Sequence, residues 1–373
     1  MSAFADRRAT RVVALALVAC AAPPAPPAAP SPAAPFAAVV DAHAATPDGA
    51  PVAGVPTFHS LGAALAAAPT VPHDAPWRVL VRRGHYDEKL TVDRPNVTLV
   101  GESEYGVVVT HADVADTPGP DGHPLGTRGS WTMRIAAPDF RAESLTVENA
   151  FDYPANAAKP DSDPTKLHNT QAVALMTVTG SDRAAFVRVR FLGYQDTLFP
   201  NVGRHYFRDC YVAGHVDFIF GAGRAVFDHC TIVSRDRGDT VNNGYVTAPS
   251  TPATEPYGFL FVDSRLLKER PRMARNSVAL GRPWHPGADP LANGSAVFIR
   301  CWMDDHIGAR GWDRMSSVDS VTRIRHWYEP EGARFYEYGS TGPGAVKSPR
   351  RRVLSDSDAQ YYTIANVLGD WKP

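Results

Sequence analysis

The sequence is poor in several features that define large classes of protein. Only 4 of its 373 residues are cysteine, too few for a small fold held together by disulfides. Its 38 basic and 39 acidic residues leave no basic excess to neutralise nucleic-acid phosphates. No run of 18 apolar residues predicts a membrane-spanning helix. The 13 histidines are scattered without metal-ligand spacing, so neither a metal nor another cofactor is expected.

The first 45 residues differ in composition from the rest. Three arginines precede a short apolar run at residues 12–19, a pattern typical of an export signal. The run ends in Leu17-Val18-Ala19-Cys20, which resembles a bacterial lipobox, whose cysteine carries the lipid; a plain secretory signal is the alternative. Residues 21–35 are almost entirely Ala and Pro, as in an extended spacer. We therefore expect a signal peptide with a lipobox at 1–20, a tether at 21–45 and a folded domain at 46–373.

The folded part is predicted to be all-β. Hydrophobic residues make up 44% of the chain and charged residues 21%, as in a globular protein. Helical periodicity is limited to residues 57–68, where Thr57 could cap a short helix. The remainder consists of short apolar runs separated by Gly, Pro, Asn and Asp, which favours a sandwich, a barrel or a solenoid.

An internal repeat favours the solenoid. A Phe-containing strand pattern recurs with its first residue at Phe186, Phe207, Phe227, Phe261 and Phe298, and more weakly at Phe140. The first two intervals are 21 and 20 residues and the next two are 34 and 37, as expected of stacked coils with loops inserted on one side. The phenylalanines should then form a ladder in the core of a right-handed parallel β-helix with a short N-terminal capping helix. Such a solenoid needs no partner, so a monomer is expected.

The repeat also places three cysteines at one position of successive coils. Adjacent coils lie about 4.8 Å apart, within the roughly 4.4–6.8 Å between Cα atoms that a disulfide requires. Cys210 and Cys230 are therefore expected to form a disulfide, whereas Cys301 is separated from them by the coil of Ser264 and should stay free. The alternative is three buried thiols.

Two copies of the repeat carry an aspartate at the same position. The pattern Gly-x-x-Asp-x-apolar-Phe occurs at residues 193–199 and at residues 214–220, and it aligns Asp196 with Asp217. Two neighbouring carboxylates cannot both ionise freely, so one should keep its proton to a higher pH than the other. Identical side chains then supply an acid and either a base or a nucleophile. The alternative is a ladder of turn aspartates on a solvated edge, but both lie in apolar, aromatic surroundings where an unpaired carboxylate is costly.

Five segments, in order, resemble the pectin methylesterase family, and its bacterial branch in particular. They are Gly84-His85-Tyr86-Asp87-Glu88, Gln171-Ala172-Val173-Ala174-Leu175, residues 193–198, Asp217-Phe218-Ile219-Phe220-Gly221 and Leu280-Gly281-Arg282-Pro283-Trp284. The resemblance covers roughly residues 50–345, and the lipobox is similar to that of outer-membrane lipoprotein members. It implies the right-handed parallel β-helix and a carbohydrate esterase that releases methanol from methyl-esterified galacturonate. It also implies a polymeric or oligomeric pectin as partner, and a location in the outer membrane, the periplasm or outside the cell.

The resemblance also implies a role for individual residues. Asp217 would be the nucleophile, Asp196 the general acid and then base, and Arg282 the partner that keeps Asp217 ionised. Amide hydrogens from Gln171 and Gln195 would stabilise the oxyanion. The side chains of Trp284, Phe220 and Val216 would contact the substrate.

Other enzymes on the same scaffold remain open. A polysaccharide hydrolase could use a carboxylate cluster such as Asp304-Asp305 with His306. An acyl thioesterase could use a carboxylate nucleophile, and a non-catalytic solenoid could bind polysaccharide. A serine hydrolase has no support, because no Gly-x-Ser-x-Gly motif occurs. The long loop at residues 152–168 is expected to wall the cleft, with His168 as an ordinary loop residue.

Overall fold

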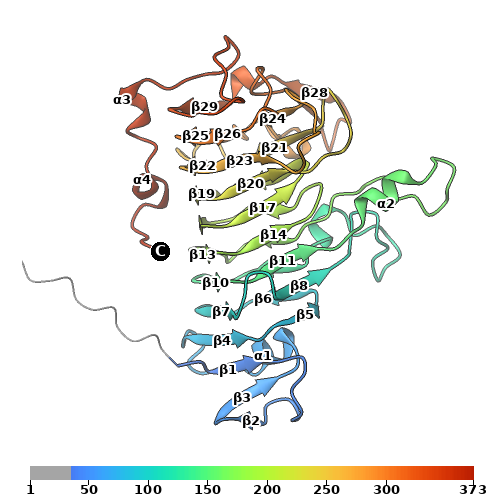
Figure 1. Ribbon diagram of the computed structural model, residues 1–373, viewed down its shortest axis with the longest axis vertical. Coiled ribbons are helices and arrows are strands. Elements are labelled where there is room, and N and C mark those ends of the chain that lie inside the picture. The colour runs from blue at the N-terminus through green and yellow to red at the C-terminus, as the bar shows by residue number, and fades with distance from the viewer. Residues whose placement is uncertain (1–34) are drawn as a thin grey trace, which may run out of the picture. The chain divides into compact units, whose positions relative to one another are not determined.

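The computed structural model describes residues 35–373, which form one compact unit. Three sheets make the faces of a right-handed parallel β-helix, and the 12-stranded sheet is the longest of them (Figure 1). The predicted signal peptide, Cys20 and most of the predicted tether lie outside the described residues. Within residues 35–373, no helix is long and apolar enough to cross a membrane.

Successive turns of the solenoid contribute strands to the three sheets, although not every turn contributes to all of them. In spatial order the 12-stranded sheet contains β2 (Pro51–Val52), β3 (Val55–Phe58), β1 (Ala38–Val40), β4 (Trp77–Val81), β7 (Val97–Gly101), β10 (Arg141–Glu143), β13 (Ala184–Val187), β16 (Arg204–Arg208), β19 (Arg224–Asp228), β22 (Phe259–Val262), β25 (Ser295–Ile299) and β29 (Arg334–Tyr338). The 8-stranded sheet contains β26 (Trp302–Met303), β23 (Arg265–Lys268), β20 (Thr231–Ser234), β17 (Tyr211–Gly214), β14 (Arg190–Leu192), β11 (Thr146–Asn149), β8 (Val107–His111) and β5 (Gly84–Asp87). The 7-stranded sheet contains β24 (Val278–Gly281), β21 (Gly244–Pro249), β18 (Val216–Gly221), β15 (Leu198–Phe199), β12 (Leu175–Thr177), β9 (Met133–Ile135) and β6 (Leu90–Val92).

The remaining elements are short. A hairpin of β27 (Met315–Val318) and β28 (Arg325–Tyr328) projects from the C-terminal part of the solenoid. The helices are α1 (Leu61–Ala66), α2 (Tyr153–Ala158), α3 (Asp356–Ala359) and α4 (Ile364–Leu368), with 3-10 turns η1 (Thr127–Gly129), η2 (Pro286–Ala288) and η3 (Pro330–Gly332). The chain end returns along the 12-stranded sheet, where α4 packs near β19 (Figure 1).

The predicted phenylalanine ladder is confirmed. Phe186, Phe207, Phe227, Phe261 and Phe298 are fully buried, and successive rings stack nearly parallel with centroids 4.8, 4.7, 4.5 and 4.4 Å apart. One weaker copy is out of register, because Ala142 rather than Phe140 pairs with Phe186. The ladder therefore ends in small and aliphatic residues toward the N-terminus, where Ala142 pairs in turn with Leu99.

Two boundaries at the N-terminal end differ from the expectation. The helix begins at Leu61 and is capped by Ser60, whose side chain accepts the Ala63 N–H, because Thr57 is already part of β3. The first strand, β1, pairs with β3 and β4 and buries Ala38 and Val40. The folded domain thus includes residues that were assigned to the tether, since even this short apolar segment can extend the sheet.

The predicted disulfide is absent from the structure. Cys210 and Cys230 occupy the same position in adjacent coils, as expected, but both are free buried thiols, as is Cys301. Side chains at equivalent positions of stacked strands run parallel at about 4.8 Å, whereas bridged Cβ atoms converge to about 3.8 Å. The thiols of Cys210 and Cys230 instead donate to the carbonyl oxygens of Phe186 and Phe207, each at 3.4 Å.

Candidate active site

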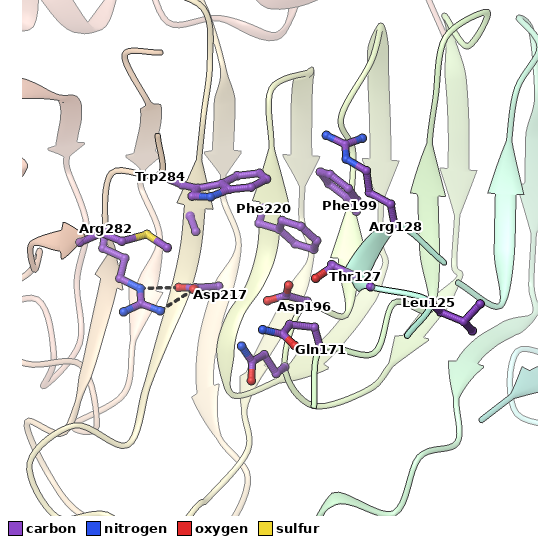
Figure 2. Close-up of a pocket in the computed structure, with 14 residues that line it drawn as sticks. Leu125, Thr127, Arg128, Gln171, Asp196, Phe199, Asp217, Phe220, Arg282 and Trp284 are labelled. Carbon is purple, nitrogen blue, oxygen red and sulfur yellow. Dashed lines mark hydrogen bonds and ion pairs between the residues drawn. The ribbon is translucent and has the colours of Figure 1, made fainter. Parts of the chain in front are cut away.

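A cavity of about 560 Å³ opens on the 7-stranded sheet and contains most of the predicted site. Both aspartates, both glutamines, Arg282, Trp284 and Phe220 line it, together with residues from a loop at 125–128 and from the β27–β28 hairpin. Figure 2 shows the carboxylates of Asp196 and Asp217 on one side and the rings of Phe199, Phe220 and Trp284 on the other. Carboxylates and a guanidinium thus face an aromatic wall.

The two repeat aspartates occupy equivalent positions in adjacent coils. Leu198 of β15 pairs with Ile219 of β18, which places Asp196 beside Asp217 in register, and the Asp196 N–H donates to the Val216 carbonyl at 3.1 Å. Both aspartates have left-handed backbone, with φ of 63° and 51°. The same left-handed backbone occurs at Asp209 and Asp263 in other turns of the solenoid, so it is not specific to the site.

A bulge in β18 presents Asp217 to the cavity. Val216 pairs with Tyr245 and Ile219 with Thr247, so three steps along β18 match two steps along β21. The extra residue redirects a side chain that a regular strand would place elsewhere. Gly214 allows this close packing, because a Cβ there would lie 2.3 Å from the Phe218 Cβ and 2.6 Å from the Tyr194 carbonyl oxygen.

Arg282 is held against Asp217 by two hydrogen bonds. Its Nε donates to Asp217 Oδ1 at 2.8 Å, and its terminal nitrogen donates to Oδ2 at 2.6 Å (Figure 2). The guanidinium also lies 4.0 Å from the centroid of the Tyr245 ring. Burial disfavours the charge on Arg282, but the adjacent Asp217 carboxylate more than offsets this and raises the pKa of the guanidinium. The pair is therefore a fixed ion pair with a defined carboxylate orientation.

Asp196 is in the opposite electrostatic situation. It is 8% exposed, and burial together with the neighbouring Asp217 charge raises its pKa well above the ordinary value, with only partial relief from Arg282. Asp196 therefore keeps its proton at a pH where an ordinary aspartate has lost it. The raised pKa is in the direction expected of Asp196 as the general acid.

The two glutamines are neighbours beside the carboxylates. Gln171 and Gln195 form a parallel backbone bridge between adjacent coils. The Oε1 of Gln195 accepts from Thr170 Oγ1 at 3.4 Å, which leaves its Nε2 hydrogens for the cavity. The Oε1 of Gln171 is buried without a hydrogen-bond partner among the described residues. Two amide groups are therefore available beside the carboxylates.

The aromatic wall is larger than the sequence analysis predicted. Phe220 stacks on Phe199 with centroids 4.0 Å apart, and Trp284 contacts both rings at 5.7 and 6.1 Å. Phe199 was missed although it holds the same repeat position as Phe220, a signal that the sequence contains. Arg128 and Met315 were also missed, and no local motif marks either of them.

Two expectations about the surroundings of the site do not hold, while His168 is the exposed loop residue that was expected. Val216 contributes its carbonyl to Asp196 but is not among the residues that line the cavity. The loop at 152–168 is also absent from that lining, because Tyr153 packs instead on Tyr194 and His215, while His168 is exposed.

The rival carboxylate cluster lies away from the cavity. Asp305 accepts from Lys268 Nζ at 2.6 Å, and buried His306 has its Nε2 3.2 Å from Ser234 Oγ. Burial lowers the pKa of His306 to about 4, so this residue is a neutral packing group. Within residues 35–373, no group of three or more His, Cys, Asp or Glu could hold a metal ion.

Comparison with known proteins finds relatives that are all pectinesterases. The Pectinesterase family model matches residues 51–370. Pectinesterase A of Dickeya chrysanthemi is 45% identical over 328 residues, covering 85% of this chain and 88% of that protein. The solved structure of pectin methylesterase PemA from Erwinia chrysanthemi is 44% identical with a TM-score of 0.86, covering 91% of this chain and 99% of the other. Pectin methylesterase from Yersinia enterocolitica is 47% identical with a TM-score of 0.81, covering 85% and 100%.

Proposed function

Because the chain belongs to the pectinesterase family and hydrolyses the methyl esters of pectin, we propose that Asp217 is its nucleophile and Asp196 its general acid and base. The observation that carries this assignment is the contrast between the two carboxyls. Asp217 is held by the two hydrogen bonds from Arg282, whereas burial and the neighbouring charge keep the proton on Asp196.

In the first half of the reaction, a carboxylate oxygen of Asp217 forms a bond to the ester carbonyl carbon. Negative charge develops on the carbonyl oxygen, where the amide hydrogens of Gln171 and Gln195 stabilise it. The carbon–methoxy bond then breaks, and Asp196 donates its proton to the leaving oxygen, so that methanol departs. The products of this half are a mixed anhydride on Asp217 and an ionised Asp196.

In the second half, Asp196 acts as the base. Its carboxylate removes a proton from a water molecule, whose oxygen attacks the acyl carbon of the anhydride. The bond from that carbon to the Asp217 oxygen breaks, which releases the galacturonate acid and restores the Asp217 carboxylate beside Arg282. Asp196 is protonated again, so the pair is ready for another ester.

The substrate is a methyl-esterified galacturonan or one of its oligomers. A structure of a related pectin methylesterase contains a hexasaccharide. Trp284 offers a ring face to a sugar, and Phe220 with Phe199 offers an apolar surface to the methyl group. The protein acts as a monomer. It is exported by the signal at residues 1–20 and held at the outer membrane through Cys20 and the Ala/Pro-rich tether.

Methanol release from highly esterified pectin tests the proposal. The purified chain should release methanol without shortening the polymer, and Asp217→Asn should lose turnover while still binding pectin, because an amide is not a nucleophile. Asp209→Asn is the matched control, since Asp209 has the same left-handed backbone in the same solenoid but is half exposed beside Arg208. A tenth of the wild-type rate retained by Asp217→Asn would reject Asp217 as nucleophile, and shortened chains would indicate a glycosidase.

A further inference from the structure

His215 is a buried histidine that the reaction described above does not use. It comes directly before Val216 and Asp217 in the chain and is only 2% exposed. Burial, together with the nearby charges of Arg237 and Arg235, lowers the pKa of its imidazole well below the ordinary value. The ring is therefore neutral, with one N–H donor and one acceptor nitrogen.

The acceptor nitrogen of this ring binds the backbone. The Val216 N–H donates to His215 Nδ1 at 2.7 Å, which places the ring proton on Nε2. Nε2 is buried without a hydrogen-bond partner among the described residues. A phenylalanine would fill the same space without an unpaired polar atom, so packing alone does not account for a histidine at this position.

The backbone of Val216 connects the imidazole to both aspartates of the site. The Val216 carbonyl accepts the Asp196 N–H at 3.1 Å, and Asp217 is the next residue of the bulged strand β18. The bulge leaves residues 217 and 218 without partners in β21, so Val216, which pairs with Tyr245, is the nearest residue before Asp217 that the sheet holds. The orientation of the Val216 backbone therefore decides where the Asp217 carboxylate lies.

Two tyrosine rings cover the imidazole. The Tyr153 ring, from the segment at 152–168, lies edge to face with the His215 ring at a centroid distance of 4.4 Å. The Tyr194 ring lies 5.5 Å from the imidazole and stacks on Tyr153 at 5.4 Å. These rings keep water away from the bond between Val216 and Nδ1, and a hydrogen bond in such surroundings is stronger than one in water.

We propose that His215 is a positioning residue, which fixes the backbone that carries Asp217 by accepting the Val216 N–H on a neutral imidazole shielded from water. This inference rests on the proposed function, because it takes Asp217 to be the nucleophile. His215 is not among the residues that line the cavity, so it acts through the backbone and not by contact with the substrate. A fixed backbone holds the Asp217 carboxylate in line with the ester carbon, and small errors in such a geometry lower the rate strongly.

Two substitutions separate this role from packing. His215→Phe keeps a ring of similar size but removes the acceptor, whereas His215→Asn removes the ring but keeps an acceptor oxygen where Nδ1 lies. We expect His215→Phe to lower kcat about ten- to a hundredfold, as for a slightly misplaced reacting group, and to change KM less than about threefold. His215→Asn should keep more of kcat than His215→Phe, although it should be less stable to urea because it leaves a cavity beside Tyr153. Methanol release from esterified pectin and urea denaturation measure the two effects.

His306→Phe is the matched control, because His306 is also a buried, neutral histidine but lies outside the cavity lining. It should leave kcat unchanged. A wild-type kcat in His215→Phe, or a lower kcat in folded His215→Asn than in His215→Phe, would overturn the positioning role and leave packing as the only contribution of the ring. Turnover retained by Asp217→Asn in the same assay would instead reject the proposed nucleophile, so the two failures are distinguishable.

Discussion

At the scale of single residues, the site depends on giving two identical side chains different protonation states. Asp217 is paired with Arg282, and the neighbouring Asp196 is buried without such a cation of its own. Burial and the adjacent negative charge both favour the protonated form of Asp196. Since the two groups interact, the pH dependence of activity belongs to the pair.

Replacing Asp196 by Asn should change the pH profile as well as the rate. Asp196 must be protonated when methanol leaves, so wild-type activity should fall as the pH rises through its raised pKa. The asparagine variant should be slower by about 10²–10⁴ and should lack this alkaline decline. Initial rates of methanol release against pH measure both effects. An alkaline limb that persists in the variant would mean that another group donates the proton.

The same substitution should stabilise the folded protein at neutral pH. An aspartate whose folded pKa is raised binds more protons folded than unfolded, so its contribution becomes less favourable as pH rises from about 4 through the folded pKa. The neutral amide of the Asp196→Asn variant carries no such cost, and a gain of about 1–2 kcal/mol is expected. Urea denaturation at acidic and neutral pH measures it. Equal stability of both proteins at neutral pH would show that burying Asp196 is not costly.

Replacing Arg282 by Lys should cost more than the retained positive charge suggests. An ammonium group cannot donate two parallel hydrogen bonds to both oxygens of Asp217. The expected loss is about 10²-fold or more in kcat, since a misplaced reacting group lowers the rate by that amount. Steady-state kinetics on esterified pectin measure it. A lysine variant with wild-type kcat would show that the orientation of Asp217 does not depend on Arg282.

At the scale of elements, the bulged strand β18 and Gly214, which ends the preceding strand β17, set the position of the nucleophile. Gly214→Ala should lower kcat with a smaller effect on KM. The added Cβ would lie 2.3 Å from the Phe218 Cβ, and the repulsion must displace the strand that carries Asp217. The matched control is Gly332→Ala, since a Cβ at Gly332 meets no atom within 4 Å. Equal kcat values for the two variants would argue that β18 tolerates the displacement.

At the scale of the molecule, the phenylalanine ladder connects the coils on which the site is built. Each ring stacks on the ring of the next coil, so neighbouring coils stabilise each other through one continuous core. Phe227→Ala should lower the free energy of unfolding by about 3–5 kcal/mol, whereas Phe227→Leu should cost less because it leaves a smaller cavity. Chemical denaturation measures the midpoint of each variant. A midpoint for the alanine variant equal to that of the wild type would exclude the ladder as a main source of stability.

Features that repeat with the coil were determined by the sequence itself. Once a period near 20 residues is recognised, the ladder of phenylalanines and the adjacency of Asp196 and Asp217 follow. The reason is that residues one period apart lie next to each other in stacked coils. The copy beginning at Phe140 was aligned wrongly by two residues, because a weak pattern cannot specify register when small and large apolar residues both fit the core.

Only the tertiary structure decided which non-repeating segments line the cavity. These are the loop that carries Arg128 and the hairpin that carries Met315, but not residues 152–168. Their positions depend on contacts between segments far apart in the chain, and no sequence repeat predicts such contacts. The pairing of Asp217 with Arg282 was expected only from family resemblance. The two residues are 65 positions apart in the chain, and the stacked coils bring them into contact. The raised pKa of Asp196 was expected from the adjacent aspartate and the apolar surroundings, whereas the burial of its carboxyl is seen only in the folded structure.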